Sequence, residues 1–362
     1  MIIIKLVAGL ILLLVGAELL VRGAARIASS MSISPLVVGL TVVAFGTSSP
    51  ELAVSLMSSL NGTPDIALGN VVGSNIFNIL FILGISALII PLSVAQQLIR
   101  IDVPLMIAIS LIVFLFALNG IISIWEGWIL ALMGIGYTIF AIKLGKKEPQ
   151  KAVVEEYKKE FGEKPEKGKD GFWMPVLFIV SGLGMLIYGS RFLVDGAVQI
   201  AQNMGVSELV IGLTIIAAGT SLPELATSIL ASIRKERDIA VGNVIGSNIF
   251  NLLIILGTTV IASPGGIRVS DSVLRFDLPV MLVVALACFP VFFTGRKIAR
   301  WEGFVFLGYF IAYTVFIILA SQQHASIQVF SRTVLWFALP ITFITFLVLA
   351  LRERNGGRSR LS

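Results

Sequence analysis

The chain contains little charge, one cysteine and one histidine. Only 13% of its 362 residues are Asp, Glu, Lys or Arg, against about 25% in a typical soluble domain. The single cysteine, Cys288, excludes a disulfide within the chain and is expected to be a small core residue. The single histidine, His324, lies in a polar stretch between two apolar runs. Sites built on His and Cys, which bind zinc and copper, are therefore not expected.

Long apolar runs take the place of the missing charge. Hydrophobic residues make up 57% of the chain, in runs close to the length of about 20 residues that a helix needs to cross a bilayer. The ten-residue alternation of a membrane β-barrel is missing. The fold class expected is therefore an all-α integral membrane protein. Candidate helices cover residues 3–21, 34–59, 65–92, 102–119, 121–144, 172–193, 207–232, 238–263, 276–294, 301–320 and 331–351.

Two segments of the chain occur twice. Residues 34–53, SPLVVGLTVVAFGTSSPELA, match residues 207–226, SELVIGLTIIAAGTSLPELA, at 14 of 20 positions with an offset of 173. The block IALGNVVGSNIFNIL at 66–80 returns as IAVGNVIGSNIFNLL at 239–253. Weaker matches extend through five helices in each half, and the run at 331–351 has no partner. An odd number of helices per copy predicts two inverted-topology repeats of five transmembrane helices, plus one extra C-terminal helix.

The distribution of basic residues predicts the topology. With the N-terminus outside, 22 of the 27 Lys and Arg residues fall on the inner side, as the positive-inside rule requires. A calcium-binding EF-hand is not expected in the polar linker, which lacks the spaced Asp and Asn ligands of that loop. The predicted parts are a first transmembrane repeat at 1–144 with its motif at 34–80, a cytoplasmic linker at 145–171, a second repeat at 172–320 with its motif at 207–253, an extra transmembrane helix at 331–351 and a cytoplasmic tail at 352–362.

Each copy of the first segment carries a glutamate in the middle of a membrane-length run. A carboxylate at the bilayer centre costs roughly 2.5–3.5 kcal/mol on insertion scales. Glu51 and Glu224 stand at matched positions, so a cation site at the interface of the repeats is expected. Gly46 and Pro50 are expected to break the first helix and to unwind the backbone from Ala44 to Thr47, which would free carbonyl oxygens for a cation.

A structural role for these glutamates is the alternative. Ser48-x-x-Glu51 and Ser221-x-x-Glu224 both fit the capping-box pattern of a helix N-terminus. A cap, however, can be made without placing a charge in the membrane. A ligand role is therefore favoured.

The second block supplies neutral oxygens. Ser74 and Asn78 are four residues apart and share a helix face, as do Ser247 and Asn251. Hydrogen bonding across a close GxxxG helix contact is the alternative role for these side chains. Carboxylate, hydroxyl, amide and carbonyl oxygens, without His or Cys, favour Ca²⁺, Na⁺ or Mg²⁺.

GTSSPE and GTSLPE, each followed by GNVxGSNIFN, closely resemble the two α-repeats of the sodium/calcium exchanger family. The resemblance implies Na⁺/Ca²⁺ antiport by alternating access around one central site, without an enzymatic activity or a cofactor. Both third-helix positions are Asn, whereas some members carry Asp at the second, so K⁺ dependence is not expected. The implied calcium ligands are Glu51, Glu224 and the carbonyls of Thr47 and Thr220; the implied sodium ligands are Ser48, Ser221, Ser74, Ser247 and the carbonyls of Ala44 and Ala217; Asn78 and Asn251 line the site.

Three alternative functions remain open at this point. A H⁺/Ca²⁺ antiporter of the same superfamily is the runner-up, and sodium dependence of calcium flux separates the two. A passive cation channel is less favoured because the repeat builds one central site in one chain, so that no oligomer is required. A membrane enzyme is disfavoured because the mid-span glutamates have no His or Lys partner. The expected partners are Ca²⁺, Na⁺ and the lipid bilayer of a plasma membrane, not nucleic acid.

Overall fold

The computed structural model describes residues 2–31, 34–145, 173–204 and 217–321. Within these ranges eight helices are long and apolar enough to cross a membrane, or nine when a bent pair counts as one span. The chain is therefore a multi-pass helical membrane protein. His324, the linker beyond residue 145, residues 207–216 of the second motif, the predicted helix at 331–351 and the tail at 352–362 lie outside the described residues.

The helices of each half follow one another in the same order, with π-helical segments labelled η. The first half contains α1 Ile2–Met31, α2 Pro35–Val38, η1 Gly39–Val43, α3 Ala44–Thr47, α4 Ser49–Leu60, α5 Pro64–Phe77, η2 Asn78–Leu83, α6 Gly84–Ile89, η3 Leu98–Asp102, α7 Val103–Ala117 and α8 Ile124–Gly145. The second contains α10 Trp173–Asn203, α12 Ala217–Gly219, α13 Leu222–Ile233, α14 Arg237–Phe250, η5 Asn251–Ile255, α15 Leu256–Ala262, η6 Val273–Asp277, α16 Leu278–Phe293 and α17 Arg300–Ser321.

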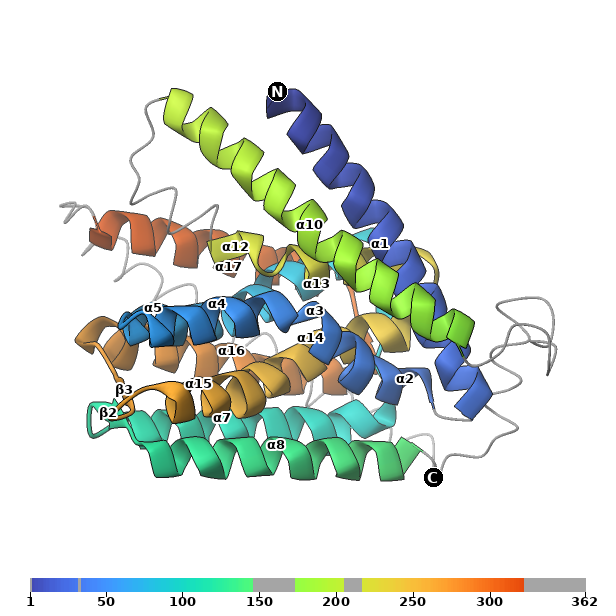
Figure 1. Cartoon of the computed structure of the whole chain (residues 1–362). Helices are drawn as coiled ribbons and strands as arrows, with labels where there is room; N and C mark the ends of the chain where they lie inside the picture. The colour runs from blue at the N-terminus through green and yellow to red at the C-terminus, as the bar shows by residue number, and fades with distance from the viewer. Residues whose placement is uncertain (1, 32–33, 146–172, 205–216, 322–362) are drawn as a thin grey trace, which may run out of the picture.

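Helices α1 and α10 form an antiparallel pair that lies at a steep angle to α7 and α8 (Figure 1). Glycines allow the backbones of α1 and α10 to approach each other closely. A Cβ atom added at Gly16 would lie 2.8 Å from the carbonyl oxygen of Gly182, and one added at Gly182 would lie 2.7 Å from the carbonyl oxygen of Gly16. Small residues at such contacts are the usual means of close helix packing in membranes.

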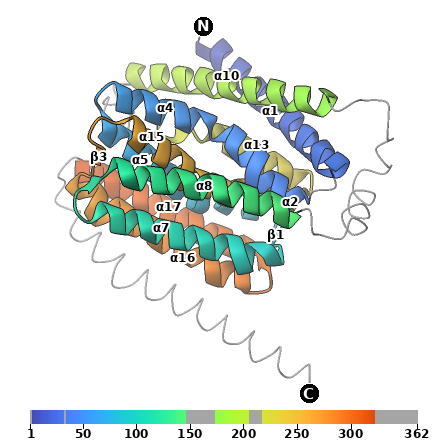
Figure 2. The same ribbon diagram turned by 60° about the horizontal axis from the view of Figure 1, so that its bottom comes forward.

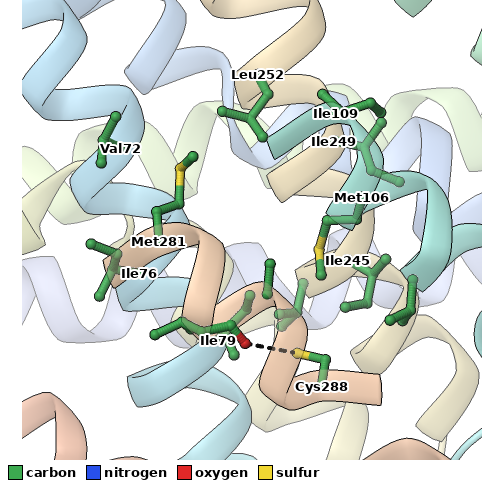
Figure 3. Close-up of a cluster of buried hydrophobic side chains, with 14 of the residues drawn as sticks. Val72, Ile76, Ile79, Met106, Ile109, Ile245, Ile249, Leu252, Met281 and Cys288 are labelled. Carbon is green, nitrogen blue, oxygen red and sulfur yellow. Dashed lines mark hydrogen bonds between the residues drawn. The ribbon is translucent and has the colours of Figure 1, made fainter. Parts of the chain in front are cut away.

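The spans built on α5 and α14 form the centre of the molecule. The most apolar stretch of each of these spans is 72% and 83% buried, respectively, whereas the corresponding stretch is 22% buried in α1 and 11% buried in α17. Seen from another side, α7 and α8 lie over the outer face of this centre (Figure 2). Apolar side chains from α5, α7, α14 and α16 meet in one cluster (Figure 3). Cys288 lies in this cluster and is fully buried, as predicted for a small core residue.

Two short strand pairs join the halves, and the all-α prediction did not include them. Strand β1 (Leu92–Ser93) pairs with β4 (Lys297–Ile298), and β2 (Ile121–Ile122) pairs with β3 (Ile267–Arg268), both antiparallel. Each pair takes one strand from either half. The loops at both ends of the bundle are thereby tied together.

The predicted helix break is present, but the predicted unwinding is wrong. The pair Pro35–Thr47 and Ser49–Leu60 bends by 43°, and only Ser48 leaves the helical conformation between them, with φ −80° and ψ 7°. Residues Ala44–Thr47 remain helical as α3. Pro50 lacks an N–H group, so it removes a single helical hydrogen bond, and losing that one bond bends the backbone without opening it.

Candidate cation site

The two glutamates lie in the first turns of α4 and α13 and are fully buried. Glu51 is 1% exposed and Glu224 is 0% exposed. Each accepts a hydrogen bond from the serine of the other motif copy. Ser221 Oγ donates to Glu51 Oε1 at 2.8 Å, and Ser48 Oγ donates to Glu224 Oε1 at 2.8 Å. The two copies, about 170 residues apart in sequence, therefore face each other directly.

The capping-box alternative does not apply to these glutamates. Neither Ser48 nor Ser221 makes a side-chain cap hydrogen bond, because each hydroxyl is directed to the carboxylate across the interface. A capping interaction is present elsewhere, at the start of α8. There Glu126 Oε2 accepts the backbone N–H of Ser123 at 2.7 Å. Glu51 and Glu224 are thus left with a role other than helix capping.

Neutral oxygens of the second block surround the carboxylates. The hydroxyls of Ser74 and Ser221 lie within hydrogen-bond distance, with their Oγ atoms 3.2 Å apart. Five oxygens around the site are buried without a hydrogen-bond partner among the described residues, although buried polar atoms are normally paired. These oxygens are Glu51 Oε2, Glu224 Oε2, Asn78 Oδ1, Asn251 Oδ1 and Ser247 Oγ.

The threonines of the motif play a part that the sequence did not reveal. Thr47 Oγ1 donates to Asn243 Oδ1 at 3.1 Å, and Thr220 Oγ1 donates to Asn70 Oδ1 at 3.3 Å. These bonds hold the turn before each glutamate against the other half. The carbonyl of Ala44 accepts the N–H of Ser48 at 3.0 Å and also lies within hydrogen-bond distance of Thr47 Oγ1, at 3.3 Å. Ala217 begins α12, and only its backbone is described.

Asn70 and Asn243 are the site residues that sequence reasoning missed. Asn70 Nδ2 donates to the carbonyl of Glu51 at 3.3 Å and to Ser55 Oγ at 3.0 Å. Asn243 Nδ2 makes the same contacts with the carbonyl of Glu224, at 3.4 Å, and with Ser228 Oγ, at 2.9 Å. A signal was available, since residue 70 precedes Ser74 by four residues and therefore shares its helix face.

The arrangement is suited to a hard cation. Every group named above offers oxygen, and no three His, Cys, Asp or Glu side chains gather anywhere in the described part of the chain. Calcium takes 6–8 oxygen ligands in flexible geometry. Two carboxylates carry the charge that balances one divalent ion. Among the described residues, the free oxygen of each carboxylate has no hydrogen-bond partner to compensate its burial.

Known proteins with related sequences are membrane transporters or membrane proteins. The putative antiporter CaxA of Alkalimonas amylolytica is 40% identical over 312 residues, covering 84% of this chain and 95% of that relative. The inner membrane protein YrbG of Escherichia coli is 38% identical over 283 residues, covering 78% and 85%. The sodium/calcium exchanger MaX1 of Methanosarcina acetivorans is 32% identical over 339 residues, covering 86% and 96%.

The fold also matches a solved exchanger structure. The sodium-calcium exchanger NCX_Mj, soaked with 10 mM Na⁺ and zero Ca²⁺, superimposes with a TM-score of 0.73 at 32% identity, covering 86% of this chain and 99% of that one. The model of the family described as "Sodium/calcium exchanger protein" matches residues 1–143 and 174–319. With both halves of the repeat included in that match, the chain belongs to the sodium/calcium exchanger family.

Proposed function

We propose that this chain is a secondary active antiporter that exchanges Na⁺ for Ca²⁺ across the membrane. The observation that carries the proposal is the reciprocal bridge between Ser48 and Glu224 and between Ser221 and Glu51, which leaves one free, buried oxygen on each carboxylate. One Ca²⁺ balances both charges, and several Na⁺ ions balance them as well. A site that holds either set of ions, but not both together, couples their movements.

The residues divide between the two ions. Glu51 and Glu224 hold Ca²⁺ together with the carbonyls of Thr47 and Thr220. Sodium binds the same carboxylates from their flanks, and Asn78 and Asn251 line the centre of the site. The sodium ligands proposed are Ser48, Ser221, Ser74, Ser247 and the carbonyls of Ala44 and Ala217.

The proposed architecture is a pair of inverted five-helix repeats, at residues 1–144 and 172–320, that exposes the site to either side in turn. The matched contacts on both copies support it: Ser48 and Ser221 each donate to the glutamate of the other copy, and Thr47 and Thr220 each donate to an asparagine of the other half. Alternating access then requires movement of one group of helices against the rest. No oligomer and no cofactor take part.

The coupling ion is tested by ⁴⁵Ca²⁺ uptake into proteoliposomes with outward Na⁺, K⁺ or H⁺ gradients applied separately. We expect only the Na⁺ gradient to drive uptake, and added K⁺ to leave the rate unchanged, because two acids cannot balance K⁺ in addition to a full sodium load. Exchange of about three Na⁺ for one Ca²⁺ moves one net charge, worth about 2.3 kcal/mol per 100 mV, so membrane potential is expected to shift the equilibrium. Uptake driven by the H⁺ gradient alone would assign the H⁺/Ca²⁺ alternative instead.

The topology proposed places the N-terminus outside, and the linker and C-terminus in the cytoplasm of a cell whose plasma membrane holds the protein. Two exposed positions test it on a Cys288→Ala background: Asn61→Cys in the loop after α4, and Lys297→Cys in β4. We expect an impermeant maleimide added to intact cells to label position 61 and to label position 297 only after permeabilisation. The reverse pattern would invert the proposed orientation.

A further inference from the structure

Two buried asparagines outside the proposed ligand set contact the two asparagines inside it. Asn75 is 2% exposed and Asn248 is 1% exposed. They follow Ser74 and Ser247 by one residue on α5 and α14. Neither belongs to the motif residues to which the proposed function assigns a role. Both lie at the centre of the bundle, where a polar side chain without a function would be costly.

Each of these asparagines accepts a bond from the other half of the chain. Asn78 Nδ2 donates to Asn248 Oδ1 at 3.0 Å, and Asn251 Nδ2 donates to Asn75 Oδ1 at 3.1 Å. The two bonds are equivalent, since each joins the start of a π-helical segment, η2 or η5, to the opposite central helix. One N–H of each inner amide, Asn78 and Asn251, is thereby hydrogen-bonded.

Two methionines orient the side-chain amides of Asn75 and Asn248, the outer pair. The oxygens of these amides then face Asn78 and Asn251, the inner pair. Asn248 Nδ2 donates to Met106 Sδ at 3.7 Å, and Asn75 Nδ2 donates to Met281 Sδ at 3.7 Å and to the carbonyl of Asn248 at 3.4 Å. A thioether sulfur accepts a hydrogen bond but cannot donate one. The nitrogen of each outer amide therefore faces its methionine and leaves the oxygen for the inner asparagine. Both methionines lie in the apolar cluster of Figure 3.

These hydrogen bonds leave the side-chain oxygens of Asn78 and Asn251 free. An amide group has a donor end and an acceptor end, and only the acceptor end attracts a cation. With their nitrogens bonded, Asn78 and Asn251 are left with Oδ1 atoms that are buried and have no partner among the described residues. Asn78 follows Ser74 by one helical turn, and Ser74 is linked through Ser221 to Glu51. The free oxygens thus belong to the same polar centre as the carboxylates.

We propose that Asn75 and Asn248 are positioning residues, which fix the amides of Asn251 and Asn78 with their oxygens turned to the cation site. The role rests on the proposed function. Without the outer pair, an inner amide can rotate and direct its N–H₂ group at the cation. The affinity for Ca²⁺ then falls, although no ligand has been removed.

The test is a double-mutant cycle on Asn248 and Asn78, with Ca²⁺ affinity measured by calorimetry on the full chain in detergent. We expect Asn248→Leu alone to weaken Ca²⁺ binding roughly 10-fold, the effect of one buried hydrogen bond. In an Asn78→Ala background, where no inner amide remains to be oriented, the same change is expected to alter affinity less than about 2-fold. An equal loss in both backgrounds would show that Asn248 acts only through general packing.

Two further measurements separate the outcomes. Thr259→Val removes a hydroxyl that is equally buried but has no hydrogen-bond partner among the described residues, and it should leave Ca²⁺ affinity unchanged. The equivalent double-mutant cycle on Asn75 and Asn251 should give the same result. It keeps the test decisive if a variant of the first cycle does not fold. Wild-type protein without measurable Ca²⁺ binding would overturn the proposed function itself. Wild-type affinity in both Asn248→Leu and Asn75→Leu would overturn only the positioning role.

Discussion

Replacement of Glu51 or Glu224 by Gln is expected to abolish calcium exchange, with a loss of about 100-fold or more in rate at any Ca²⁺ concentration. Each carboxylate supplies half of the charge that balances Ca²⁺ in a site closed to water. Glutamine keeps an oxygen that accepts the serine hydroxyl, so the bridge between the two motif copies is retained. The measurement is Na⁺-dependent ⁴⁵Ca²⁺ uptake into proteoliposomes, with protein amount and monodispersity checked in parallel.

A matched control for these variants exists in α8. Glu126→Gln makes the same chemical change in a capping interaction outside both motif copies, where Gln also serves as a cap. It is expected to leave exchange within about 2-fold of the wild type. Near wild-type exchange in Glu51→Gln or Glu224→Gln would show that the altered glutamate is not a ligand.

Gly246→Leu is expected to prevent correct folding. A Cβ atom at Gly246 would lie 2.6 Å from the carbonyl oxygen of Leu40 and 2.8 Å from its Cα atom. These are backbone atoms of η1, so the added side chain must push α14 away from the bent helix that carries the first motif. Overpacking in a well-packed core typically costs about 1–3 kcal/mol, and a backbone clash in the most buried of the described spans is expected to lie at or above the upper limit.

The expected readout is loss of the monodisperse peak in size-exclusion chromatography, or a large fall in melting temperature where protein is recovered. Ala108→Leu, at an exposed position of α7, adds comparable bulk and is expected to behave like the wild type. A stable, active Gly246→Leu variant would contradict the close contact between α14 and η1.

The chemistry of the site could be predicted from the sequence because it depends on composition and on spacing within one helix. Low charge and long apolar runs indicated the membrane. A doubled motif with a mid-span glutamate predicted a cation site, and the shared helix face of Ser74 and Asn78 identified neutral oxygens beside it. The structure brings Glu51, Glu224 and these oxygens into one polar centre. Such features are local, so no knowledge of the packing was needed.

Backbone detail was predicted less well. The motif predicted an unwound stretch, whereas the helix bends at Ser48 and continues. The π-helical segments that begin at Asn78 and Asn251 had no recognisable signal in the sequence. Both features depend on where single hydrogen bonds are lost, and neighbouring helices decide how such a loss is accommodated.

The sequence by itself determined that this chain is a helical membrane protein with a duplicated motif of oxygen-bearing side chains. Only the tertiary structure decided which oxygens are free. Ser48 looks like a cap for Glu51 in the sequence but bonds Glu224 instead, and Asn248 acquires its contact with Asn78 across 170 residues of chain. Sequence spacing reports which side chains share a face of one helix, but it does not report which face of another helix they meet. The packing of α3 against α13 and of η2 against α14 supplied that information, because it sets the donors and acceptors that each buried oxygen encounters.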